Sequence, residues 1–412
     1  MRSVGNRMTP RSVHIALGPG PLCLGLLAPA SAGAGFDTYL IGPPGTRHPP
    51  AFERVVFARD GSVHTETIEV AGFDGPPGSV ASPTVRAAVE RADLVLITVS
   101  MRQRVAARRD LILALVDACQ PDAEVVFTAC DNTLTPAHHQ LLGELAERGV
   151  LCPPTIADRV CIRPRGRRGA AHPRQVLTHE VGAWSFPEPS GASLLRERLG
   201  PAPEVRFVEA EQFAAHWDQK LWIVNGGHLA LALPARRYNR ADLRLAANDP
   251  ALLRPMQQII EGMAVALEAR HGIDVDPVWA LDRERVVMQL PDFADRVLSG
   301  FTRSGLAAFL ESFAERIGRP AAIVKQAGGP LDGFEPLART LTAMLREGHH
   351  YNDLLSITPD EVSAAGDANA VAAYREALGR WMPSDFVAAG ARDIESTLRY
   401  QRDQLRRRGR LA

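Results

Sequence analysis

Residues 12–25 read SVHIALGPGPLCLG, an apolar run that ends in a Gly-Pro-Gly turn and continues into a helical pattern. A strand, a glycine turn and a helix in this order are typical of a dinucleotide-binding turn, because glycine lets the backbone approach a pyrophosphate at the helix N-terminus. Pro21 suits the first helical position, where a missing N–H costs little. The pattern therefore predicts that a dinucleotide contacts Gly18, Gly20, Leu22 and Cys23.

Two features of this turn depart from the usual fingerprint. Its third position holds Cys23 in place of glycine, although Gly25, two residues on, can supply the close packing. No acidic residue ends the second predicted strand at residues 37–42, where a carboxylate would normally bind the adenine ribose. Arg47 follows and is either a contact for a 2′-phosphate or an ordinary loop arginine, so the choice between NAD and NADP stays open.

The chain on either side of the turn alternates strand-like and helix-like segments. Strands are predicted at 12–17, 37–42, 52–57, 63–70, 93–99 and 124–128, and helices at 21–34, 84–91 and 103–119. This alternation indicates a parallel sheet covered on both faces. Helical periodicity dominates further on, at 209–233, 249–271, 304–317, 333–347, 368–379 and 384–407. We therefore predict an α/β protein, with a Rossmann-like doubly wound domain at 12–200 and a mostly α-helical substrate domain at 201–412.

Composition argues against several classes of protein. The chain has 412 residues, with 47 basic and 47 acidic side chains and no net charge, which is unlike a nucleic-acid binder. It has no apolar run of about 18 residues that could span a membrane, and residues 1–11 lack the apolar core of a signal peptide. Its five cysteines form no CxxC pair, so a reduced, cytoplasmic protein without a zinc site is expected. A monomer and a small homo-oligomer are both compatible with the sequence.

The most informative segment is residues 217–233, WDQKLWIVNGGHLALAL. It reads as a helix that is apolar nearly all round and therefore buried. Lys220, Asn225 and His228 interrupt it. On an α-helix they fall at about 0°, 140° and 80°, which is one broad polar arc with His228 in its middle. The adjacent Gly226-Gly227 pair suggests that a ligand or another backbone approaches closely.

These three side chains suit proton transfer at an alcohol. Burial of an isolated ammonium usually lowers its pKa, and such a lysine is a competent general base, which arginine is not. Asn225 can donate to a developing alkoxide and His228 can orient a substrate hydroxyl. A snorkelling lysine and a satisfied core histidine are the competing interpretation. Of the 47 basic residues only Lys220 and Lys325 are lysine, and this scarcity favours a functional Lys220.

The spacing Lys220-x4-Asn225-x2-His228 is similar to the signature of the metal-independent polyol-specific long-chain dehydrogenases. Within that family the helix most resembles the branch of mannitol-1-phosphate 5-dehydrogenases and mannitol dehydrogenases. Residues 129–132, Ala-Cys-Asp-Asn, resemble the family's element at the end of a strand. Residues 157–160, Ala-Asp-Arg-Val, resemble its Asp-Arg turn. The likeness spans most of the chain.

The resemblance implies a Rossmann-type domain, a helical substrate domain and an active site in the cleft between them. It implies that Lys220 takes the alcohol proton, that Asn132 and Asn225 hold the alkoxide-like oxygen, and that His228 assists in positioning the substrate. The hydride would pass to or from NAD or NADP without a metal, with Asn132 also near the cofactor. Asp131 and Arg159 are the corresponding substrate-binding candidates. Asn132 also stands just after a predicted strand, where open α/β sheets place ligands.

One segment differs clearly from the family. Its basic Gly-Arg-Asp-Pro-x-Arg-Lys-Leu element is replaced by GRPAAIVK at residues 318–325, and its following Asn-Asp-Arg by Gly-Gly-Pro at 328–330. Mannitol 1-phosphate is therefore not the expected substrate. Lys325 is either a contact for a substrate phosphate or carboxylate, or an exposed lysine.

Three functions are compatible with the sequence. The first is an NAD(P)-dependent oxidoreductase that interconverts a secondary alcohol and a ketone on a polyol, sugar or sugar phosphate. The second is a redox-neutral isomerase or epimerase with a tightly bound nicotinamide. The third is a non-catalytic descendant of the fold, which the intact set of Lys220, Asn225, His228 and Asn132 disfavours.

Overall fold

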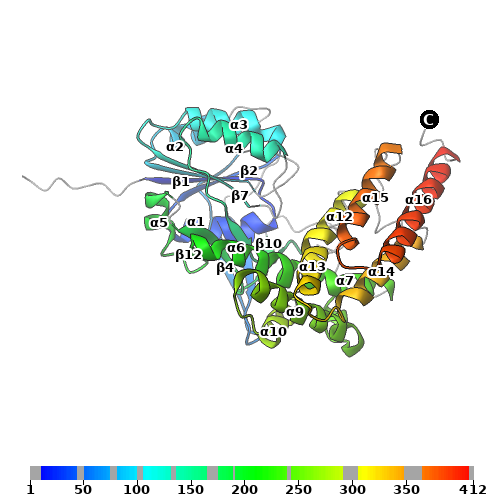
Figure 1. The fold of residues 1–412 in the computed structure, drawn as a ribbon. Coiled ribbons are helices and arrows are strands. Elements are labelled where there is room, and N and C mark those ends of the chain that lie inside the picture. Colours follow the sequence, from blue (N-terminus) through cyan, green and yellow to red (C-terminus); the bar gives the residue numbers. More distant parts are fainter. Residues whose placement is uncertain are drawn as a thin grey trace, which may run out of the picture. The chain divides into compact units, whose positions relative to one another are not determined.

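The computed structural model describes residues 11–43, 51–74, 81–99, 105–130, 136–164, 175–188, 191–238, 243–290, 305–347 and 364–407. The chain divides into two compact units, residues 1–214 and 215–412. Strands occupy the first unit and the second is helical throughout its described part, as Figure 1 shows. The predicted fold class, an α/β N-terminal region followed by a mostly helical C-terminal region, is confirmed.

A five-stranded parallel sheet forms the centre of the first unit. Its order is β5-β2-β1-β6-β7. The strands are β1 (Ser12–Leu17), β2 (Asp37–Ile41), β5 (Gly72–Asp74), β6 (Leu94–Val99) and β7 (Glu124–Ala129). Leu17 pairs with both Ile41 and Val99, and Val99 pairs with Ala129. The strands β1, β2, β6 and β7 therefore end at the same level of the sheet. The segments that follow these strands therefore begin at the same edge of the sheet.

Alternate residues of the sheet face two different layers. Val95 and Ile97 pack with α2 (Pro83–Val89), α3 (Val105–Asp117) and α4 (Pro136–Ala146). Leu94 and Leu96 pack with the π-helix η1 (Cys23–Leu27), α1 (Ala28–Gly33) and α5 (Ser193–Leu199). In Figure 1, α2, α3 and α4 lie together on one side of β1 and β2, and α1 and α5 lie on the other. Because both faces are covered, β1 and β6 are buried along their whole length.

Seven further strands build two smaller sheets in the first unit. One has the order β4-β3-β10-β9, from β3 (Ala51–Phe57), β4 (Val63–Glu69), β9 (Cys161–Ile162) and β10 (Gln175–His179). The other has the order β12-β11-β8, from β8 (Ile156–Asp158), β11 (Ala183–Glu188) and β12 (Val205–Glu209). Sequence alternation predicted the strands at 52–57 and 63–70, but they form an antiparallel hairpin outside the parallel sheet. The connection at 58–62 is too short for a parallel crossover.

The second unit is organised around a long helix, α9 (Pro250–His271), which contacts α7 (Gly227–Arg237), α10 (Pro277–Val287), α13 (Arg319–Gln326) and α14 (Phe334–Arg346). Asp249 caps its start by accepting from the Ala251 amide at 3.0 Å. Gly272 ends it in the left-handed region, at φ +66°. The remaining elements are the end of α6 (Ala210–Gln219), η3 (Lys220–Gly226), α8 (Leu243–Ala246), α12 (Leu306–Phe313), η4 (Ala314–Gly318), α15 (Ala364–Leu378) and α16 (Ser384–Arg407).

Helical periodicity located most of these elements but not all of them. The single helix predicted at 209–233 is three consecutive pieces, α6, η3 and α7, with a π-helix in the middle. Helices α10 and α13 were not predicted. None of the described helices combines the length and the apolar character that crossing a membrane requires.

Candidate active site

Lys220, Asn225 and His228 lie on one continuous helical stretch, within η3 and the first turn of α7. The Gly227 amide donates to the Trp222 carbonyl, five residues back, as expected for a π-helix. Each π turn contains more residues than an α turn, so Asn225 lies nearer to the Lys220 face than the predicted separation of about 140°. The α-helical projection was therefore wrong here, and the three side chains share a narrower face. Single π turns are frequent at functional sites.

The Asn225 side chain has an unused donor. Its Nδ2 atom is buried and has no hydrogen-bond partner among the described residues. A buried donor without a partner costs about 1–3 kcal/mol, and a bound water or a ligand can supply the partner. Nε1 of Trp222, on the same stretch, is buried without a described partner as well. His228 lies three positions after Asn225, which places both on one side of the helix. The arrangement places a donor without a described partner on the same side of the helix as an imidazole.

His228 has a charged neighbour that sequence reasoning missed. Its Nε2 atom lies 2.7 Å from Oε2 of Glu284 on α10, and the two side chains are 6% and 0% exposed. Arg283 approaches the other oxygen of Glu284, with Nη1 at 3.5 Å from Oε1. Glu284 lies in an Arg-rich segment with only a weak apolar stripe, so the sequence gives no indication that its side chain is buried.

Lys220 is half-buried at the start of η3. Two residues earlier, the buried Asp218 lies with Oδ2 at 2.8 Å from Nε2 of His271 and 3.1 Å from Nε of Arg270. These contacts join the end of α6 to the end of α9. They fix the backbone from which the Lys220 side chain starts.

Packing explains Gly226 of the Gly226-Gly227 pair, but not Gly227. A Cβ on Gly226 would lie 2.7 Å from Cε of Met263 on α9 and 2.9 Å from the Arg316 carbonyl oxygen on η4. The predicted close approach of another backbone is confirmed, and it comes from η4. A Cβ on Gly227 would meet only flexible side-chain ends at 3.4 Å or more.

Two other predicted substrate contacts have protein partners. Lys325 on α13 is exposed, and its Nζ donates to the Trp381 carbonyl at 3.1 Å. The Arg159 side chain is 5% exposed, and its Nη2 donates to the Glu180 and Gly182 carbonyls at 3.2 and 3.0 Å. Burial lowers the pKa of this guanidinium. A role in substrate binding stays a prediction for both residues.

In the first unit, the glycine turn lies at the carboxyl edge of the parallel sheet. Gly18 has φ +88°, a conformation that favours glycine, and its amide donates to the Ile41 carbonyl at 2.8 Å. The Gly20 amide is also used within the turn, donating to the Gly18 carbonyl at 2.7 Å. Pro19 and Pro21 have no N–H. The next amides, of Leu22 and Cys23, begin the helix, where N–H groups lack intrahelical partners.

This turn fits a pyrophosphate. A Cβ on Gly20 would meet only the Gly18 carbonyl oxygen, at 3.9 Å, so the space beside it is open to a ligand. Gly25 has the close packing expected of the third glycine, because a Cβ there would lie 2.4 Å from Sγ of Cys161. Burial raises the pKa of the Cys23 thiol to about 12, so this side chain stays neutral beside the turn.

Two arginines that the sequence did not single out contact this edge of the sheet. Nη2 of Arg163 donates to the Pro19 carbonyl within the turn. Nη2 of Arg108, on α3, donates to the Gly42 carbonyl just after β2, at 2.5 Å. Both positive charges suit an anionic ligand. Because the chain contains so many arginines, nothing in the sequence distinguishes these two from the others.

Asp131, Asn132 and Arg47 lie outside the described residues. The structure places only the strand that precedes Asp131 and Asn132. Cys130 follows β7, and its amide donates to the Val99 carbonyl at 2.8 Å. The predicted roles of Asp131 and Asn132 at this edge remain predictions.

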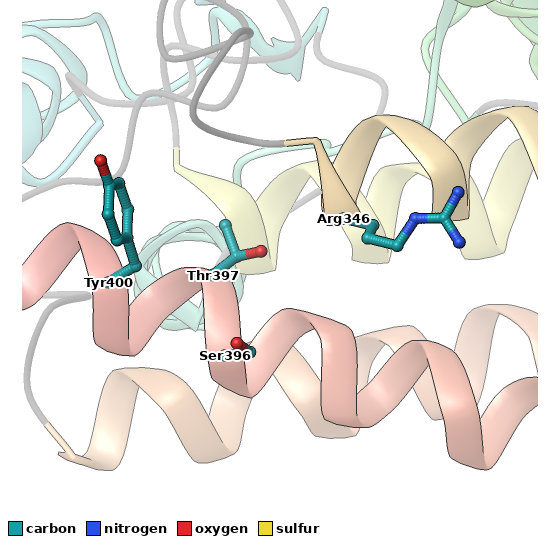
Figure 2. A pocket seen from close by; sticks show the side chains of 4 residues that line it. All are labelled: Arg346, Ser396, Thr397 and Tyr400. Carbon is teal, nitrogen blue, oxygen red and sulfur yellow. The ribbon is translucent and has the colours of Figure 1, made fainter.

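Two surface hollows of the second unit are separate from these residues. Arg346 of α14 and Ser396, Thr397 and Tyr400 of α16 line one of them. In Figure 2 the guanidinium of Arg346 and the hydroxyl of Tyr400 point away from each other. The other lies among α7, α9 and α14 and includes Tyr238 and Leu252. Neither is lined by Lys220, Asn225 or His228.

Comparisons with known proteins show similarity at the level of the fold. No family model matches the chain, and no curated protein matches its sequence. The structure of a D-sorbitol dehydrogenase in substrate-free form is similar over 97% of this chain and 94% of that chain, with a TM-score of 0.64 and 12% identity. Mannitol 2-dehydrogenase from Pseudomonas fluorescens, in a complex with NAD and D-mannitol, covers 95% and 94%, with a TM-score of 0.60 and 12% identity. The chain therefore shares its fold with dehydrogenases that act on polyols.

Proposed function

We propose that the protein is an NAD(P)-dependent oxidoreductase of the polyol-specific long-chain dehydrogenase type, which interconverts a secondary alcohol and a ketone on a polyol, sugar or sugar phosphate. The observation that carries this proposal is the buried Nδ2 of Asn225, which has no hydrogen-bond partner within the described part of the chain and lies on the same helical stretch as Lys220 and His228. A buried donor beside a titratable amine and an imidazole is suited to an oxygen that gains negative charge. The fold shared with D-sorbitol and mannitol 2-dehydrogenases supports the same class of reaction.

Each side chain has a distinct role in the proposed reaction. Lys220 takes the hydroxyl proton during oxidation and returns it during reduction, contributing on the order of 10²- to 10⁴-fold. Asn225 donates from Nδ2 to the oxygen as its negative charge develops. His228 holds a neighbouring hydroxyl of the substrate. A bound nicotinamide supplies or accepts the hydride.

The cofactor is proposed to bind at the glycine turn of the first unit. The Leu22 and Cys23 amides, at the start of the helix, would bind the pyrophosphate. Arg163 holds the turn through the Pro19 carbonyl and adds a positive charge. Arg108 brings a second charge to the end of β2, where no acidic residue follows. The choice between NAD and NADP stays open.

Fluorescence titration with NADH and NADPH, followed by assays on polyols, ketoses and their phosphates, tests the proposal. Saturable binding of one dinucleotide and turnover of at least one ketose are the expected results. Failure of the purified protein to bind either dinucleotide would contradict the proposal. A nicotinamide that co-purifies and never exchanges would instead favour the redox-neutral isomerase.

A further inference from the structure

Glu284 is a carboxylate placed in the core of the second unit. Its side chain is 0% exposed, and the α10 residues Ala280, Leu281 and Val287 around it are buried. Taking a carboxylate out of water is expensive unless partners compensate, and an apolar residue would be the cheaper occupant. We therefore expect the role of this buried acid to involve the residue that it contacts.

That partner is His228, which the proposed function places at the substrate. The 2.7 Å between Nε2 and Oε2 is the length of a charge-assisted hydrogen bond. The Nε2 hydrogen is not directed at this oxygen, and the two atoms form no hydrogen bond in this structure, so the ring would have to turn to form it. Catalytic hydrogen bonds are often poorly aligned before the substrate binds.

The position of Glu284 in the chain makes it an effective support. It comes from α10, which follows α9 through residues 272–276, so it reaches His228 from a different helix. Arg283, 10% exposed, lies at 3.5 Å from the other carboxylate oxygen and restrains the acid from the second side. A carboxylate at one imidazole nitrogen decides which nitrogen carries the proton and how the ring is turned.

We propose that Glu284 is a positioning residue, which holds the proton of His228 on Nε2 and fixes the ring for binding a hydroxylated substrate. This inference rests on the proposed function for the role of His228, and adds the group that controls it. The neutral ring then has its acceptor at Nδ1, the form that takes a hydrogen bond from a hydroxyl group. Loss of the carboxylate would leave the histidine present but incorrectly oriented.

The first test is the histidine tautomer in the wild-type protein, which needs no variant. Long-range ¹H–¹⁵N spectra of histidine-labelled protein, with His228→Gln to assign the signal, should show His228 protonated at Nε2. The Glu284→Gln variant should change this signal and leave that of His271 unchanged. A His228 protonated only at Nδ1, or a His228 signal identical in the Glu284→Gln variant, would overturn the proposal.

The second test separates positioning from stability. Glu284→Gln should raise KM for the substrate by roughly tenfold or more, because the substrate would meet an incorrectly oriented imidazole. It should lower kcat less, and leave the dissociation constant of the dinucleotide unchanged. Tyr374→Phe is the matched control, because it removes a buried hydrogen bond to Thr342, 2.8 Å long, in the same unit. This control should lose stability and keep its KM.

The outcomes distinguish this inference from the proposed function. An active, dinucleotide-binding protein whose KM is the same in Glu284→Gln would refute the positioning role and leave the proposed function intact. A protein that binds no dinucleotide would refute the proposed function, and the spectra would still decide whether Glu284 sets the tautomer.

Discussion

At the scale of single residues, the candidate site depends on polar groups that the interior does not fully satisfy. Asn225 keeps a buried donor without a described partner, and Glu284 keeps a buried carboxylate against His228. Both cost stability. Asn225 lies within the stretch whose spacing suggested catalysis, and Glu284 contacts that stretch from α10. Such local conflicts are expected at functional sites. They also occur at other described positions, since Nε1 of Trp222 and Oγ1 of Thr128 are buried without a hydrogen-bond partner too.

Replacing Asn225 with leucine should affect activity far more than stability. Because Nδ2 has no described partner to lose, the free energy of unfolding should fall by less than about 0.5 kcal/mol. The ratio kcat/KM should fall by roughly 10²-fold, since one oxyanion donor is lost. Urea unfolding and steady-state kinetics measure the two effects.

Thr342→Val provides the opposite control. Its hydroxyl donates to the Ala338 carbonyl at 2.9 Å and lies 2.8 Å from Oη of Tyr374. Its loss should cost about 1 kcal/mol of stability with turnover unchanged. Equal loss of stability in both variants would show that Asn225 is an ordinary structural residue.

At the scale of elements, the sequence predicted strands and long helices better than their irregularities. The apolar runs of β1, β6 and β7 predicted buried parallel strands because both faces of that sheet are covered. Lys220, Asn225 and His228 were selected as candidates from their residue types, but periodicity cannot distinguish a π turn from an α-helix. Helix α10 has a weak apolar stripe and was missed, although Asp276 caps it and Pro277 begins it. Glu284 was missed with it.

The packing of η3 against α9 and η4 predicts different effects of alanine at Gly226 and at Gly227. Gly226→Ala should lower the free energy of unfolding by about 1–3 kcal/mol, because its Cβ would clash with Met263 and with the Arg316 backbone. Gly227→Ala should be close to neutral, since its nearest neighbour is the flexible end of Met256 at 3.4 Å. Urea unfolding of both variants measures the difference.

Gly143→Ala on α4 is the reference for helix propensity. A Cβ there meets nothing within 4 Å, so the variant should gain up to about 1 kcal/mol. If Gly226→Ala proved as stable as Gly227→Ala, the close packing of η3 against η4 would be refuted.

At the scale of the whole molecule, the proposed cofactor site lies in one compact unit and the proposed catalytic residues lie in the other. Alternation of strands and helices predicted this division of fold class. The two small sheets were not predicted as sheets, because strands as short as Cys161–Ile162 have too few residues to show a period. Their partners are also far away in sequence, as when Gln175 pairs with Glu53.

Global stability should depend on pH through His14, at the centre of the first unit. This residue is 0% exposed, its Nε2 lies 2.9 Å from Oγ1 of Thr98, and burial lowers its pKa from 6.5 to about 3. Below pH 6.5 the unfolded chain binds a proton that the folded chain does not. Stability from this group is therefore lost as the pH falls from 6.5 towards 3, at about 1.4 kcal/mol per pH unit.

Comparison of the wild type with His14→Gln measures this contribution. The variant keeps a group that can hydrogen-bond to Thr98 and does not titrate, so its stability should fall less between pH 6.5 and 4. His139→Gln, at an exposed position of α4, should behave like the wild type. Identical pH slopes in His14→Gln and the wild type would refute the assignment to His14.

The central claim, that Lys220 is the base for hydride transfer, is tested most directly by single-turnover kinetics of Lys220→Arg and Lys220→Met with a substrate of the wild type. Arginine keeps the positive charge but cannot give up its proton. The account predicts that both variants bind the dinucleotide as the wild type does and transfer hydride roughly 10²- to 10⁴-fold more slowly. Hydride transfer at the wild-type rate in either variant would contradict it.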